Sequence, residues 1–131
     1  MLRQAPIPAP GRAFDADTVW TLFEGRTDRM RHVWKITSST LPGYMNGLSA
    51  AVESGDWVSA ARHAHSLAGS ASNFGAHALV ATARRIEDQA SEGSVLGGEV
   101  QEARTQFDAL CAAVTAWLDQ VSSPPEAPPA G

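Results

Sequence analysis

The sequence has little that would support a disulfide, a membrane span or an export signal. Its single cysteine, Cys111, cannot form an internal disulfide, which fits a reducing compartment. No apolar run approaches the ~18 residues that a membrane-spanning helix needs. Residues 1–11 contain three prolines and no apolar central region, so they do not read as a signal peptide. We therefore expect a cytoplasmic protein without a membrane span.

Positive charge is also scarce. The formal net charge is −4 with neutral histidines, and no cluster of Lys and Arg suits a phosphate backbone, so nucleic acid is not an expected partner. Hydrophobic residues make up 44% of the chain and charged residues 18%, as in ordinary globular proteins. A chain of 131 residues suits one domain with one core.

Proline is concentrated at the two ends of the chain. Residues 1–13 are rich in Pro and Ala and are predicted to form a flexible arm. Residues 122–131 are a Pro-rich segment, predicted to be a flexible tail or a linker. The folded body is therefore expected to be residues 14–121.

Apolar residues recur at helical spacing through this body, and no segment alternates like a β-strand. The pattern predicts a short helix at 15–24 and four longer ones, from Thr27 as N-cap to Gly55, at 57–72, at 76–91 and from Leu96 to Val121. Pro42-Gly43 predicts a kink or a break in the second helix. The expected fold is all-α, an antiparallel four-helix bundle preceded by a short N-terminal helix.

The predicted helix at 57–72 carries a histidine among very small side chains. On a helical wheel, with 100° per residue, His65 lies on the same side as Ala61, Arg62, Ala68, Gly69 and Ser72. Leu67 and Ala71 point towards the opposite side, which is expected to face a core. Small side chains around an exposed imidazole would let another protein approach it closely.

This region resembles the active helix of histidine-containing phosphotransfer domains. That family carries a pattern close to A-H-[ST]-L-K-G-[SA]-A-x-N-[FLI]-G-A, which appears here as Ala64-His65-Ser66-Leu67-Ala68-Gly69-Ser70-Ala71-Ser72-Asn73-Phe74-Gly75-Ala76. Gly55-Asp56-Trp57 matches the turn before the active helix, and Ile86-Glu87 stands where the family usually has Leu-Glu. One departure is plain, because the family's lysine is Ala68 here.

The resemblance implies a phosphorelay intermediate without kinase activity of its own. His65 would take a phosphoryl group from the receiver aspartate of a hybrid sensor histidine kinase and pass it to the aspartate of a response regulator. The sequence has no Gly-rich nucleotide loop, which agrees with a carrier rather than a kinase. No cofactor is expected on this chain, and Mg²⁺ would be supplied by the partner receiver domain.

Several residues are expected to support His65. Glu87 would accept a hydrogen bond from Nδ1–H and leave Nε2 free, or it is an ordinary solvated charge. Arg62 would pair with the phosphoryl group or an acidic partner. Gly69 would provide clearance, or else a tight helix–helix contact. The remaining residues expected in the docking face are Ala61, Ala68 and Ser72.

Two further interpretations concern metal binding and function. His63 points about 160° away from His65 on the wheel, so it is expected at the edge of the core, and no metal site is expected from this pair. The alternative function is a non-catalytic helical interaction module that binds receiver domains or other partners without phosphotransfer. Ala68 in place of lysine favours this alternative, and the intact setting of His65 argues against it.

Overall fold

The computed structural model describes residues 13–122, so the arm and tail predicted at the two ends lie almost entirely outside the described part. The described residues form five helices and no strand, namely α1 (Ala16–Leu22), α2 (Thr27–Ser54), α3 (Trp57–Ser72), α4 (His77–Ser91) and α5 (Gly97–Ser122). The prediction of an all-α fold is confirmed.

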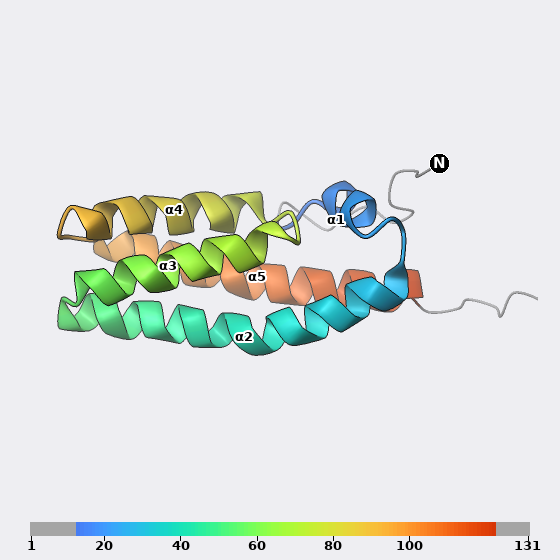
Figure 1. Ribbon diagram of the computed structural model, residues 1–131, viewed down its shortest axis with the longest axis horizontal. Helices are drawn as coiled ribbons and strands as arrows, with labels where there is room; N and C mark the ends of the chain where they lie inside the picture. Colours follow the sequence, from blue (N-terminus) through green and yellow to red (C-terminus); the bar gives the residue numbers. More distant parts are fainter. Residues whose placement is uncertain (1–12, 123–131) are drawn as a thin grey trace, which may run out of the picture.

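Helices α2 to α5 form an antiparallel bundle (Figure 1). Each reverses direction at a short connection, and the packed pairs are α2 with α3, α3 with α4, α4 with α5, and α5 with α2. Helix α3 therefore lies between α2 and α4, with one of its faces left open to solvent.

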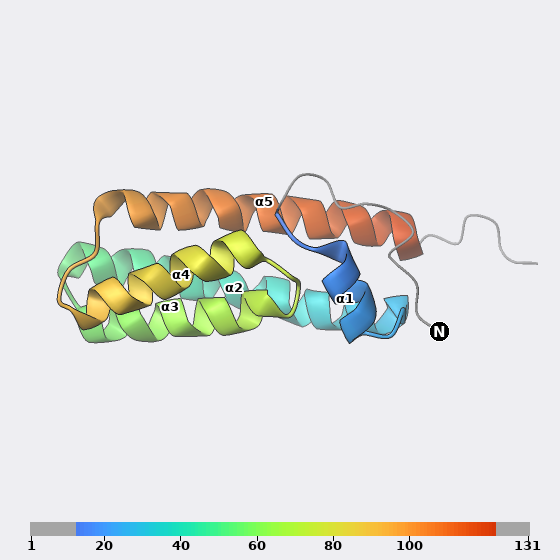
Figure 2. The ribbon, with the colours of Figure 1, turned by 90° about the horizontal axis from the view of Figure 1, so that it is seen from above.

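The four helices differ in length, and α1 lies where the shorter pair ends. Helices α2 and α5 have 28 and 26 residues, whereas α3 and α4 have 16 and 15. At 1.5 Å per residue, the long pair extends roughly 15 Å beyond the short pair. Figures 1 and 2 show α1 beside this extension. The aromatic contacts that hold this end together are Phe14–Trp117, Trp20–Trp117, Phe23–Phe74 and Trp34–Phe74.

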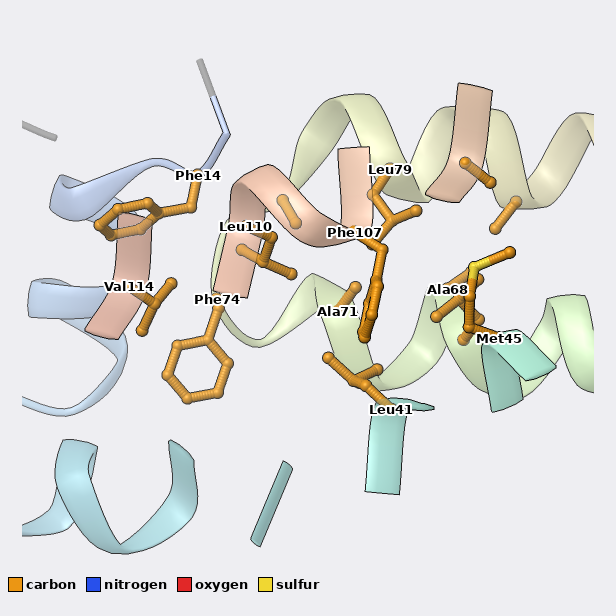
Figure 3. Packing of buried hydrophobic residues seen from close by; sticks show 14 of the residues in the cluster. Phe14, Leu41, Met45, Ala68, Ala71, Phe74, Leu79, Phe107, Leu110 and Val114 are labelled. Carbon is orange, nitrogen blue, oxygen red and sulfur yellow. The ribbon is translucent and has the colours of Figure 1, made fainter. Parts of the chain in front are cut away.

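One core of buried hydrophobic residues joins all five helices, and Figure 3 shows part of it from close by. The large buried side chains come mainly from α2 and α5. Helix α3 instead contributes one leucine and four alanines, Ala60, Ala64, Ala68 and Ala71. Alanine side chains allow helix axes to approach closely, because interaxial distance depends on the side chains at the contact. The small core face of α3 thus brings its backbone close to α2 and α4.

Of the two alternatives predicted at Pro42, a kink or a break, the break does not occur. Helix α2 continues from Thr27 to Ser54 and bends gently in Figure 1. Hydroxyl groups in the preceding turn donate to the helix's own carbonyls, Ser39 to Lys35 at 2.8 Å and Thr40 to Ile36 at 2.9 Å, an arrangement that often bends helices. Burial of the apolar stripe on both sides of Pro42 outweighs the lost backbone bond.

The prediction for the N-cap of α2 was wrong. Thr27 is the first residue of α2 rather than its N-cap, which is Arg26 without a side-chain hydrogen bond. At the end of α3, Asn73 has a right-handed backbone (φ −65°), and Gly75 adopts the left-handed conformation (φ +62°) that glycine tolerates.

Asp15 joins α1 to the connection between α3 and α4. Its carboxylate caps α1 by accepting from the backbone of Asp17 and from the hydroxyl of Thr18 at 2.9 Å. Its own backbone N–H donates to the carbonyl of Gly75 at 2.9 Å, and its carboxylate lies 3.5 Å from Nε2 of His77. The hydrogen bond from Thr18 is the main cause that lowers the pKa of Asp15.

Candidate functional site

His65 lies near the middle of α3, on the open side of the helix. The helix begins cleanly because the Asp56 carboxylate accepts a hydrogen bond from the backbone N–H of Ser59 at 3.1 Å. The buried side of α3 is the side that carries its core alanines and Leu67, so His65 is left on the open side. The imidazole of His65 is 70% exposed, so a partner protein can reach it.

Glu87 on α4 makes direct contact with His65. The distance between His65 Nδ1 and Glu87 Oε2 is 3.1 Å, and the glutamate side chain is 29% exposed. An ionised carboxylate only accepts hydrogen bonds, so this contact favours the tautomer that carries its proton on Nδ1. The lone pair is then on Nε2, the other ring nitrogen. The structure thus brings together the two residues that the sequence placed in one site.

Gly69, one turn after His65, faces open space. A Cβ added to Gly69 would meet no heavy atom within 4 Å apart from its own helix surroundings. The alternative of a tight helix–helix contact at Gly69 is therefore wrong. The neighbouring Ser72 is exposed, and its hydroxyl donates to the Gly69 carbonyl at 2.7 Å. Ala61 is half-buried at the edge of this face.

The sequence was compared with protein-family models and with curated proteins and solved structures. The family model of the Hpt domain matches residues 32–123, which include the exposed histidine, its glutamate partner and the open glycine. The chain belongs to the Hpt domain family. The resemblance inferred from the motif is thereby confirmed. No curated protein and no solved structure gives a match.

Membership of the Hpt family gives the general function. Hpt domains are phosphocarrier modules that work with receiver domains in two-component phosphorelays, and the chain is accordingly a histidine phosphotransfer module. In the part of the chain that the structure describes, no helix has both the length and the apolar character needed to cross a membrane.

Ala68 is the one predicted docking residue that the structure places elsewhere. Its side chain is fully buried, and Figure 3 shows it inside the core with Met45 of α2. The core direction of α3 lies roughly a third of a turn from His65, on the side of Ala64 and Ala68. The wheel alone could not reveal this, because alanine fits either a core or a docking face. A cation at this position of the Hpt motif would have to emerge from the core before it could face His65.

The exposed stripe of α3 instead follows the other side of His65. It comprises Arg62, Ser66, Gly69 and Asn73, at steps of four, three and four residues, with Ser66 half-buried and the others exposed. Such spacing keeps side chains on one helical face. Ser66 and Asn73 were not predicted as part of the docking face, although their spacing from Arg62 was available in the sequence.

Arg62 and Arg85 differ in whether their side chains are free to act near His65. Arg62 is exposed on the stripe, and its charge adds to the Ser59 hydrogen bonds that lower the pKa of Asp56. Arg85 on α4 turns towards α5, where it lies 3.4 Å from Glu99 and 3.5 Å from Glu102. Arg85 is therefore engaged away from His65, and Arg62 remains a candidate cation on the face of the Hpt histidine.

His63 lies on the opposite flank of α3, as the wheel predicted. Its half-buried ring covers Gly47 of α2, where an added Cβ would come within 2.6 Å of the ring atom Cε1. Glycine at position 47 thus makes room for the imidazole. His63 and His65 point apart, and the described residues contain no group of three or more His, Cys, Asp or Glu side chains placed to hold a metal ion.

Proposed function

We propose that this Hpt domain carries a phosphoryl group on Nε2 of His65, between the aspartate of one receiver domain and the aspartate of another. The observation that carries the proposal is the 3.1 Å contact from Nδ1 to Glu87 on an imidazole that is 70% exposed. It supports a ring that is held in one tautomer and presents its nucleophilic nitrogen to solvent.

The chemistry needs no general base on this chain. The Nε2 lone pair attacks the phosphorus of the acyl phosphate, the P–O bond to the aspartate breaks, and the receiver recovers its carboxylate. The new N–P bond leaves a positive charge on the ring, which still holds its proton on Nδ1. The Glu87 carboxylate stabilises that charge through the same hydrogen bond. Transfer to the second aspartate reverses these steps.

The remaining groups for the reaction would come from the partner. The receiver would hold Mg²⁺ and place it against the transferred phosphoryl oxygens. The donor would be the receiver of a hybrid sensor histidine kinase and the acceptor a response regulator, with the exchange in the cytoplasm. Arg62, three residues before His65, is the nearest candidate on α3 for an ion pair with the phosphoryl group or an acidic partner.

Incubation with phosphorylated receiver domains tests the proposal. We expect an acid-labile, base-stable label on the wild-type protein, complete loss of label in His65→Ala, and retention in His63→Ala. The second variant is a matched control, because His63 lies on the same helix but points away. Binding of receivers without any label would instead favour the interaction-module alternative, whose main support was Ala68. Burial of Ala68 weakens that support.

A further inference from the structure

A hollow lies beyond the end of α3, between α1 and the first turns of α2. Its volume is ≈ 450 Å³. The residues lining it that matter here are Leu22, Phe23, Arg26, Arg29, Val33 and Asn73. Figure 1 shows that α1 and the beginning of α2 extend past the end of α3. The lining residues place the hollow in this region.

The hollow continues the exposed stripe that flanks His65. Asn73 is both the last member of the stripe and part of the wall of the hollow. It follows His65 by eight residues, which corresponds to about 12 Å along a helix. A protein interface of ordinary size covers about 800 Å² on each partner, a patch about 30 Å across. A partner centred on His65 and lying over Gly69 therefore reaches the hollow.

The chemistry of the hollow favours a segment that is both apolar and acidic. Phe23 and Val33 are half-buried and form an apolar floor, and the side chain of Leu22 remains 54% exposed. Arg26 and Arg29 add two positive charges against one carboxylate, that of Glu24. Within residues 13–122, Arg29 makes no ion pair, and Arg26 makes only a long one with Asp28 at 3.9 Å.

Most of this hollow comes from outside the region that the Hpt family model matches. That match begins at residue 32, so α1 and both arginines precede it. The hollow thus lies mostly before the matched part of the chain, next to the phosphotransfer face. A binding surface at that position suits selection among partners that share the same receiver chemistry.

We infer that this hollow is a second anchor point for the partner receiver, where an apolar side chain and neighbouring carboxylates of the receiver surface dock. The inference rests on the proposed function for the identity of the partner. It assigns Arg26 and Arg29 to affinity and partner choice, and leaves the chemical step to His65 and Glu87.

Charge reversal on two faces of α2 tests the inference. The test variant is Arg26→Glu with Arg29→Glu. The matched control is Arg31→Glu, because Arg31 lies on the opposite side of α2, in a different hollow lined also by Trp34 and Lys35. Glutamate in the first turn of a helix is compatible with the helix dipole, so the test variant should keep its melting temperature. Receiver affinity and single-turnover transfer are both measured, with each receiver of the source organism.

The expected result is roughly a tenfold weaker receiver affinity for the double variant and less than a twofold change for Arg31→Glu, with the same transfer rate at saturating receiver. Equal affinities for all three proteins would overturn the inference while the label on His65 still supports phosphotransfer. Weaker binding of the double variant without any label on His65 would support the hollow and contradict phosphotransfer. Self-association that only the double variant loses, with receiver affinity unchanged, would assign the hollow to a second copy. Binding of no receiver at all would overturn both proposals.

Discussion

Replacing Gly69 by alanine should stabilise the protein, although the residue belongs to the most characteristic motif of the chain. Glycine in a helix interior costs about 0.5–1 kcal/mol relative to alanine, because more backbone freedom is lost on folding. A Cβ at Gly69 meets no atom within 4 Å, so nothing offsets that gain. We expect a gain of about 0.5–1 kcal/mol, or roughly 2–6 °C in melting temperature for a domain of this size.

Gly47 gives the contrasting case in the neighbouring helix. Alanine there gains the same helix propensity, but its Cβ would lie 2.6 Å from Cε1 of His63, so the ring must move. Overpacking of this kind typically costs about 1–3 kcal/mol. Gly47→Ala should therefore leave the stability unchanged or lower it, in contrast to Gly69→Ala.

Urea unfolding and thermal melting of both variants measure the difference. Gly69→Leu should also leave stability nearly unchanged, yet block phosphotransfer because its side chain fills the docking face. Gly43→Leu is the control, since Gly43 is an exposed helical glycine with open space around it on α2. A clear loss of stability in Gly69→Ala would refute the reasoning and would mean that Gly69 packs against other atoms.

Three other substitutions test the Glu87 contact, the burial of position 68 and the cap of α1. Glu87→Gln should slow single-turnover transfer from a phosphorylated receiver by roughly threefold to tenfold, because the neutral amide stabilises the charged ring less and the pair is partly screened by water. An unchanged rate would mean that Glu87 is an ordinary surface charge. Ala68→Lys should lower the free energy of unfolding by about 1–3 kcal/mol, since its position is buried, and unchanged stability would contradict that placement. Asp15→Ala should cost about 1 kcal/mol through the lost helix cap. Because the pKa of Asp15 is lowered in the folded protein, this cost should be complete above about pH 5 and shrink on acidification below about pH 4. A cost that does not depend on pH would contradict a role for the ionised carboxylate.

The sequence was sufficient for the fold and for the pair at the centre of the site. Helical spacing predicted five helices because each buries one continuous stripe, and the element boundaries agree to within a few residues. Motif spacing placed His65 and Glu87 on adjacent helices, and the structure brings them to 3.1 Å. Both results depend on patterns that are local in the sequence.

Open alternatives and errors occur where local patterns do not determine the outcome. Pro42 could break or bend a helix, and only packing on both sides of it decides that α2 continues. Ala68 suits a core or a surface equally, so its burial follows from the rotation of α3 against its neighbours. The hollow beside α1 was not foreseen, because it is formed by residues from three separate segments, at Leu22, Arg29 and Asn73.

Nε2 of His65 is the atom that we propose carries the phosphoryl group. Nuclear magnetic resonance of the protein labelled with ¹⁵N in histidine, phosphorylated by its receiver, measures this directly through the coupling between ¹⁵N and ³¹P. We predict coupling to Nε2 of His65, with Nδ1 still protonated and hydrogen-bonded to Glu87. Coupling to Nδ1 of His65, or to a nitrogen of any other histidine, would contradict the account.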